Sequence, residues 1–281
     1  MLGQTIAIIG ATASGKSELS LKMAKDLNAN ILSLDSLSIY KEIDIASAKP
    51  SIEQRGEIKH FGIDLIYPDE SFSVATFIEL FKEAKKISDQ QNKSLIIVGG
   101  TSFYLKALID GISPLPKIDS STRQECDNIM SDLTQAYRLL LQIDPYSAKK
   151  IASSDSYRIQ KLLLIYLASK MAPSEWFRLH PKEPILTNFK LLTTDITKEQ
   201  LLKRITERTH KMMQSGLIDE VCYLESKYSR AHNSLKSIGI KETLLYLDGY
   251  VTKEQLIEQI IINTSHLAKR QNTFNKSQFM L

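Results

Sequence analysis

The feature that most constrains this chain is the segment Ile6–Ser17, with the sequence IAIIGATASGKS. Its first four residues are apolar, as in a buried parallel strand, and residues 10–17 then match the pattern G-x-x-x-x-G-K-[ST]. Apolar residues at helical spacing follow from Glu18 to Leu27. This succession of strand, glycine-rich loop and helix predicts an α/β fold with a phosphate-binding loop after its first strand.

Such a loop binds anions because its backbone N–H groups point at one phosphate group and the helix N-terminus adds positive potential. Lys16 supplies a mobile cation, and the hydroxyl of Ser17 is a candidate ligand for Mg²⁺. A glycine turn without a ligand is the alternative, which the agreement of the loop with its flanks disfavours. We expect a bound di- or triphosphate, not specifically ATP, on eight residues: Gly10, Ala11, Thr12, Ala13, Ser14, Gly15, Lys16 and Ser17.

The composition of the chain argues against several functional classes. The two cysteines, Cys126 and Cys222, lie far apart, and the five histidines form no H-x-x-x-H pair, so no zinc site is expected. No apolar run approaches the roughly 20 residues that span a bilayer, and no signal peptide is evident, so we expect a cytoplasmic protein without a membrane partner. The net charge of +4 over 281 residues permits a polyanionic partner without requiring one.

Two further apolar runs end in residues suited to chemistry. Ile31–Leu34 reads as a strand that ends at Asp35, where open α/β sheets place their active sites. Asp35 is therefore a candidate general base or Mg²⁺ partner, with helix capping as an equally weighted alternative. Residues 94–98 read as a third strand that runs into Gly99-Gly100-Thr101. The two glycines would allow the backbone to approach a ligand closely, and Thr101 would begin the next helix.

The rest of the chain divides at Gly111–Pro116, where two prolines in three residues break the pattern. Residues 116–185 are expected to be wholly helical, and strand-like Leu191–Thr194 suggests a return to the sheet. The expected architecture is a parallel sheet flanked by helices, resembling phosphate-loop NTPases, formed by residues 1–115 and 186–281. An all-helical domain of residues 116–185 would interrupt it. Nothing in the sequence requires more than a monomer.

The residues alone leave the activity open. A kinase or ATPase usually has an acid after a buried strand to hold Mg²⁺, besides the loop. Here the strand at residues 94–98 ends in glycines, which is awkward for a motor-type ATPase but tolerable for a kinase of small metabolites. A nucleotide-dependent RNA-binding module without chemistry is a third possibility, which the presence of Asp35 beside an intact loop disfavours.

Eight segments, in order and with consistent spacing, resemble one family, the tRNA dimethylallyltransferases, also called tRNA isopentenyltransferases. The resemblance covers nearly the whole chain and rests on these blocks: GATASGKS at 10–17, SLDSLSIYKEIDIASAKP at 33–50, FSVATF at 72–77, VGGTSFYLKALIDGISPLP at 98–116, RIQKLLLIY at 158–166, RITERTHKMMQSGLIDEV at 204–221, SIGIKE at 237–242 and LAKRQNTF at 267–274.

The resemblance implies a reaction in which a dimethylallyl group passes from dimethylallyl diphosphate to the N6 amine of an adenosine in tRNA. That adenosine is position 37, next to the anticodon, in tRNAs that read codons beginning with U, and diphosphate is released. Asp35 would then accept the proton of the amine, Arg208 would clamp the diphosphate, and Thr101 would help to position the reactants. A relative that prenylates free adenine nucleotides, an adenylate isopentenyltransferase, is the alternative.

The same resemblance implies contacts with the anticodon stem-loop, together with Mg²⁺ as the cofactor. The expected tRNA-binding residues are Asp35, Ser36, Leu37, Ser38, Thr101, Arg123, Ile159, Gln160, Lys161, Leu162, Leu163, Lys236, Ser237, Ile238, Gly239, Ile240 and Lys241. The helical domain adds further cations at Arg138, Lys149, Lys150 and Arg158. Ser38 stands where the family usually has glutamine, which removes the paired donor and acceptor of an amide.

Overall fold

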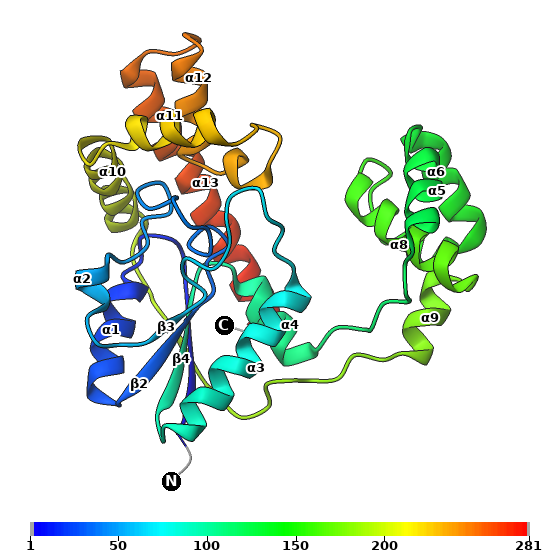
Figure 1. The fold of residues 1–281 in the computed structure, drawn as a ribbon, viewed down its shortest axis with the longest axis horizontal. Coiled ribbons are helices and arrows are strands. Elements are labelled where there is room, and N and C mark those ends of the chain that lie inside the picture. The colour runs from blue at the N-terminus through cyan, green and yellow to red at the C-terminus, as the bar shows by residue number, and fades with distance from the viewer. Residues whose placement is uncertain (1–2, 280–281) are drawn as a thin grey trace. The chain divides into compact units, whose positions relative to one another are not determined.

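The computed structural model describes residues 3–279 of the chain, and these divide into two units. One unit consists of residues 1–109 and 186–281, and the other of Asp110–Ile185. The second unit begins at Asp110, a few residues before the prolines at 114 and 116. Figure 1 shows both units, coloured along the chain.

A five-stranded, wholly parallel sheet in the order β3-β2-β4-β1-β5 forms the centre of the first unit, which confirms the expected fold class. Its strands are β1 (Thr5–Ile9), β2 (Ala29–Ser33), β3 (His60–Phe61), β4 (Ser94–Gly99) and β5 (Lys190–Thr193). The chain passes from β1 to β2 toward one edge of the sheet, and later from β4 to β5 toward the opposite edge. The neighbouring strands β1 and β4 therefore mark the crevice where ligands bind in open parallel sheets.

The helices of this unit are α1 (Lys16–Asp26), α2 (Ile52–Arg55), α3 (Val74–Gln90), α4 (Ser102–Asp110), α10 (Lys198–Gln214), α11 (Leu217–Lys227), α12 (Ile240–Leu247) and α13 (Lys253–Phe279), with a 3₁₀ helix at Asn233–Lys236. Helices pack on both faces of the sheet. Ile31 packs in one cluster with Ala24 of α1, whereas its neighbour Asn30 donates a hydrogen bond to Ser88 of α3. Successive strand residues point to opposite faces, so α1 and α3 lie on opposite sides of the sheet.

The stretch between β2 and α3 contains two short elements that the sequence pattern does not reveal, α2 and β3. With four and two residues, they are too short to show a hydrophobic period. Ser73 caps α3 by accepting a hydrogen bond from the N–H of Thr76.

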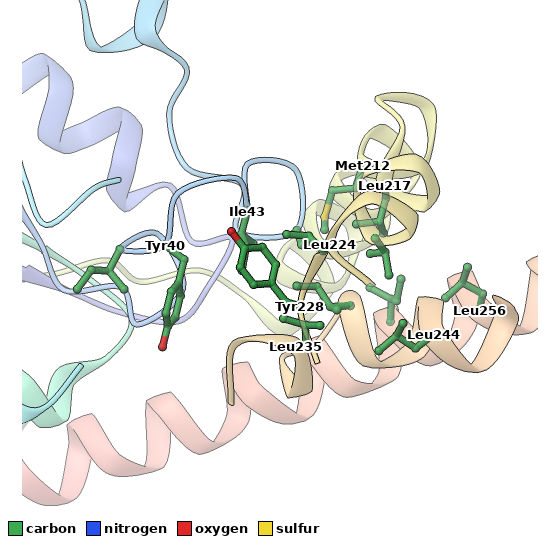
Figure 2. Close-up of a cluster of buried hydrophobic side chains, with 14 residues drawn as sticks. Tyr40, Ile43, Met212, Leu217, Leu224, Tyr228, Leu235, Leu244 and Leu256 are labelled. Carbon is green, nitrogen blue, oxygen red and sulfur yellow. The ribbon is translucent and has the colours of Figure 1, made fainter. Parts of the chain in front are cut away.

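The loop that follows β2 is held by a hydrophobic cluster from the C-terminal part of the chain. Ile43 of the loop is completely buried among Leu217, Leu224 and other side chains of α10 to α13, and Figure 2 shows this gathering of side chains. The carboxylate of Glu220 accepts hydrogen bonds from three successive backbone N–H groups, at Asp44, Ile45 and Ala46. The loop therefore has a fixed path over the carboxyl end of the sheet.

The second unit is wholly helical. It contains α5 (Ser120–Met130), α6 (Leu133–Ile143), α7 (Pro145–Ala148), α8 (Ser156–Ser169) and α9 (Pro173–Leu179). Its own hydrophobic core is built around buried side chains of α5, α6 and α8, among them Cys126, Leu140 and Leu163. No helix within residues 3–279 is both long and apolar enough to cross a membrane.

One buried carboxylate joins two helices of this unit. Asp144 is only 2% exposed, and its oxygens accept from the N–H of Ser147 at 3.0 Å and from that of Ser174 at 2.6 Å. It thus caps both α7 and α9. Burial opposes ionisation of Asp144, but the hydrogen bonds from Ser147 and Ser174 outweigh that effect and lower its pKa.

We predict that Asp144→Ala lowers the free energy of unfolding of the helical unit by about 2–4 kcal/mol, because two buried N–H groups lose a charged acceptor. Asp132→Ala, which removes the exposed cap of α6, is the matched control and should cost about 1 kcal/mol. Because the pKa of Asp144 is lowered on folding, its contribution is present at neutral pH and disappears as pH falls below the ordinary value of 3.8. Calorimetric unfolding of the full chain measures the free energy of unfolding of both variants. An equal decrease in the two variants would contradict the prediction.

Candidate active site

The carboxyl ends of the strands enclose a hollow of about 510 Å³ beside the phosphate-binding loop. Loops after β1, β2 and β4 meet here, as expected for a parallel sheet with its crevice between β1 and β4. The hollow brings together residues that are far apart in the sequence. The sequence-predicted site residues among its lining are Thr12, Ala13, Ser14, Gly15, Lys16, Ser17, Asp35, Ser38 and Arg208.

The phosphate-binding loop has the backbone shape that anion binding needs. Gly15 has a φ of +94° and Ala13 a φ of +60°, so the chain passes through left-handed conformations before α1 begins. A Cβ atom at Gly15 would lie 3.1 Å from Nη1 of Arg204, so the glycine also allows close packing with α10. The hydroxyl oxygens of Ser14 and Thr194 lie 2.5 Å apart and tie the loop to the residue after β5.

Lys16 is folded back onto its own loop. Its ammonium group donates to the carbonyl oxygen of Ala11 and lies 3.5 Å from the hydroxyl of Ser14. Burial lowers the pKa of Lys16 to about 8, although the neighbouring Asp35 carboxylate raises it, and Arg208 lowers it further. An anion in the hollow would take over the ammonium group from the Ala11 carbonyl.

Arg208 provides a second cation from α10. Its Nη1 donates to the Thr12 hydroxyl at 3.2 Å, and its Nη2 lies 3.4 Å from the carbonyl oxygen of Ser47. Burial lowers the pKa of Arg208, and Asp35 raises it. The guanidinium group is thus oriented toward the phosphate-binding loop.

Asp35 lies at the end of β2 in a tight turn. Its Oδ1 accepts hydrogen bonds from the N–H of Leu37 at 2.8 Å and from that of Ser38 at 3.2 Å. The residues that follow Asp35 form a turn and no helix, so the helix capping that the sequence left open as an alternative is not observed. The carboxylate closes this turn and also lines the hollow. Thr101 lies close by, since its hydroxyl accepts from the N–H of Ser36 at 3.3 Å.

The two glycines at the end of β4 have a packing role that the sequence did not reveal. A Cβ atom at Gly99 would lie 2.7 Å from Leu34, and one at Gly100 would collide with the side chain of Gln271. The space that glycine leaves is therefore filled by protein. The close approach that these glycines allow is to the loop after β2 and to α13, although both also line the hollow.

Gln271 is a site residue that sequence reasoning missed. Its Oε1 accepts from the N–H of Thr12 at 2.7 Å, and its Nε2 donates to the carbonyl oxygen of Gly100 at 3.1 Å. A single amide thus joins the loop after β1 to the loop after β4. Gln271 stands within LAKRQNTF at 267–274, but nothing in that segment indicates partners so far away in the sequence.

The expected tRNA-binding residues have very different exposures. Ile159, Leu163 and Ile240 are completely buried, so their side chains belong to hydrophobic cores and offer no surface to a partner. Ser38 is also buried, against the hollow. Gly239 is buried as well. The other members lie at least partly at the surface, and the exposed ones are Ser36, Arg123, Lys161, Lys236 and Lys241.

A second hollow, of about 940 Å³, adjoins the first and shares Arg208 and Lys49 with it. Arg55 and Lys211 contribute cations to its wall. Lys49 is almost completely buried and pairs with Asp44 and Asp64, so it stabilises the loop between the two hollows. The first hollow differs from the second in having the phosphate-binding loop and Asp35 in its wall.

A family model described as IPP transferase matches residues 38–278. The tRNA dimethylallyltransferase of Sulfurimonas denitrificans is 52% identical over 274 residues, which cover 98% of this chain and 92% of the relative. That of Helicobacter pylori (strain J99) is 43% identical over 274 residues, with 98% and 87% covered. These relatives extend the similarity beyond the residues that the family model matches.

Solved structures agree with the sequence relatives. A structure of a eukaryotic dimethylallyltransferase acting on tRNA has a TM-score of 0.83 and 26% identity, covering 99% of this chain and 72% of that one. A tRNA isopentenylpyrophosphate transferase from Staphylococcus epidermidis has a TM-score of 0.68 and 30% identity, covering 98% and 91%.

The pKa of Lys16 predicts how anion binding depends on pH. In the free protein the ammonium group loses its proton as pH rises through about 8, so affinity for a diphosphate monoester should fall about tenfold per unit above that pH. Titration calorimetry between pH 7 and 10 measures this, with Lys16→Arg as a variant whose charge does not change. Constant affinity of the wild-type protein over this range would contradict the prediction.

The lowered pKa of Lys16 also affects the free energy of unfolding. Because the pKa of Lys16 is lowered on folding, the cost of burying its charge is present below about pH 8 and disappears as pH rises toward 10.5. Lys16→Met should therefore stabilise the unligated protein at pH 7 more than at pH 10. Chemical denaturation at the two pH values measures the difference, and an equal effect would contradict the assignment.

We predict that Gln271→Ala weakens diphosphate binding about five- to twentyfold, because the loop after β1 loses its link to the loop after β4. Asn272→Ala, at an exposed neighbouring position on α13, is the matched control and should leave binding unchanged. Gln271→Glu keeps an acceptor for Thr12 but sets a carboxylate oxygen against the Gly100 carbonyl in the wall of the anion site, so it should weaken binding at least as much as Gln271→Ala. Unchanged affinity in Gln271→Ala would show that the link does not position the loop.

Proposed function

This chain belongs to the IPP transferase family, and on that premise we propose that it transfers the dimethylallyl group of dimethylallyl diphosphate to an adenosine of tRNA. The bond between the first allyl carbon and the diphosphate oxygen breaks, and a bond from that carbon to N6 of adenine forms. The N6 amine loses one proton, and diphosphate leaves. The chain is thus a prenyl transferase that modifies tRNA.

The observation that carries this proposal is the convergence of anion-binding groups and a carboxylate on one hollow. The leaving group accumulates negative charge as the allylic bond breaks, so donors must be in place before the reaction. The N–H groups of residues 13–17 and the side chains of Lys16 and Arg208 are such donors. A phosphate-binding loop in this enzyme holds the group that leaves, whereas in a kinase it holds the group that is transferred.

Asp35 is proposed to accept the proton of the adenine amine. The amine becomes acidic only as it bonds to carbon, so the carboxylate must already be in position when that bond forms. The turn at Leu37 and Ser38 fixes Oδ1 of Asp35 and thereby orients the whole carboxylate. Thr101, linked to the same turn through Ser36, is proposed to help position the nucleotide.

Mg²⁺ is proposed as the cofactor on the chemistry of the available donors. The exposed hydroxyl of Ser17 lines the hollow, and no group of three acidic, histidine or cysteine residues suited to a metal occurs within residues 3–279. This fits an ion that takes few protein ligands and completes its coordination with phosphate oxygens and water. When bound, it would neutralise charge on the diphosphate.

The tRNA substrate must present an adenosine that can leave its stack. A base inside a duplex cannot reach a hollow at the edge of a sheet, whereas one in the anticodon loop can be turned outward. We propose position 37, next to the anticodon, in tRNAs that read codons beginning with U. The helical unit of residues 110–185 is proposed to grip the anticodon stem-loop, with exposed Arg123 and Lys161 among its contacts.

Transfer of label tests this function. The purified chain is incubated with Mg²⁺, labelled dimethylallyl diphosphate and bacterial tRNA, with AMP and ATP as parallel acceptors. Label should enter tRNA alone, and mapping should place it at adenosine 37. Label in the free nucleotides alone would instead support an adenylate isopentenyltransferase. Absence of transfer, together with hydrolysis of ATP, would contradict prenyl transfer altogether.

We predict that Asp35→Asn lowers kcat about 10²- to 10⁴-fold and leaves diphosphate affinity within a fewfold of wild type. The asparagine oxygen can still accept from Leu37 and Ser38, so the turn is kept and only the charge is lost. Single-turnover transfer to tRNA and equilibrium binding of a diphosphate monoester measure the two quantities. Full activity in this variant would exclude Asp35 as the base.

A further inference from the structure

The helical unit has a hollow of its own, of about 420 Å³, between α7, α8 and α9. Its apolar lining includes Ile151, Leu162 and Phe177. Two tyrosines also line it with most of their surface exposed, 65% for Tyr146 and 68% for Tyr157. We refer to this feature, defined by these five residues, as the tyrosine hollow.

All charged residues that line the tyrosine hollow are cations. Nζ of Lys150 lies 3.6 Å from the ring centroid of Tyr146, and Nζ of Lys161 lies 5.5 Å from that of Tyr157. The third cation, Arg158, pairs with Asp155 at 2.7 Å outside the hollow. Each tyrosine ring therefore has an ammonium group over it, and the hollow as a whole attracts an anionic partner.

The helices around the tyrosine hollow are fixed by the fold. Asp144 caps α7, which carries Tyr146, and α9, which carries Phe177. Tyr157 lies on the first turn of α8, whose opposite side holds the completely buried Ile159 and Leu163. The backbone that carries the aromatic side chains is thus held in place, so a flat ligand would find its platform largely formed.

We infer that the tyrosine hollow binds one unstacked base of the tRNA anticodon loop, with Lys150 and Lys161 facing the adjoining phosphates. This rests on the proposed function and assigns to the helical unit a contact with a base in addition to contacts with the backbone. Exposed aromatic rings beside cations are the usual platform for single-stranded nucleotides, because every base offers a flat face. A paired stem could not use such a hollow, since its bases are stacked on one another.

Removal of the rings tests the inference. The affinity of the full chain for an anticodon stem-loop RNA should fall about five- to a hundredfold in Tyr146→Ala, Tyr157→Ala or the double variant. Tyr146→Phe and Tyr157→Phe keep the rings and should bind as wild type. Tyr250→Ala removes an exposed tyrosine of the other unit and is the matched control.

Salt dependence separates stacking from charge. Lys150→Ala and Lys161→Ala should each reduce the slope of log affinity against log salt concentration by about one, because each removes a phosphate contact. The tyrosine variants should lower the affinity and leave the slope unchanged. Equal slopes in all variants would contradict the assignment of the two lysines to phosphates.

The nucleotide is identified by replacing each unpaired loop base with 2-aminopurine. One position should be quenched by wild-type protein and not by the double tyrosine variant, and an abasic nucleotide there should make wild type and variant bind equally. Wild-type affinity in the double variant would overturn the inference and leave the tyrosine hollow to a protein partner. Transfer of the dimethylallyl group to tRNA by the wild-type protein is measured in parallel. A complete absence of transfer would show that the proposed function fails, independently of the binding results.

Discussion

The balance of charge in the hollow beside the phosphate-binding loop is the constraint on which the rest of the site depends. Lys16 and Arg208 are cations whose pKa values burial lowers, and Asp35 is the carboxylate that raises both. Lys16 donates to the carbonyl oxygen of Ala11. A strongly anionic ligand in the hollow would place both cations in a more favourable environment and, in the proposed reaction, would leave Asp35 to the incoming amine.

This balance requires parts of the chain that are far apart. Thr194, Arg208 and Gln271 all follow the helical unit in the sequence, yet each contacts the loop at residues 10–17. The C-terminal helices also hold the loop after β2 through the cluster in Figure 2 and through Glu220. The environment of this loop is therefore built by both halves of the divided unit.

The sequence predicts the frame of this site well because buried parallel strands are continuous apolar runs and the loop has a fixed spacing. It does not reveal the packing that completes the frame. Gln271 bonds across 259 residues, and the sequence around it carries no sign of that partner. For the same reason the block at 158–166 suggests a segment for tRNA binding, whereas only the packing of α8 decides that Ile159 and Leu163 are buried.

The glycines after β4 illustrate the same limit. Two glycines at the end of a strand indicate that something approaches the backbone closely, and the sequence favours a ligand there. The fold also brings Leu34 and Gln271 close to these glycines, on the side where a Cβ atom would stand. The pattern predicts the close approach, and the tertiary structure decides what approaches.

The most direct measurement is a crystal structure of the chain with Mg²⁺ and the thiolo analogue of dimethylallyl diphosphate. The predicted result places both phosphorus atoms against residues 13–17 and Arg208, with Lys16 released from Ala11 and the allyl group directed toward Asp35. Diphosphate bound in the larger neighbouring hollow, beside Arg55 and Lys211, would contradict the assignment of the phosphate-binding loop to the leaving group.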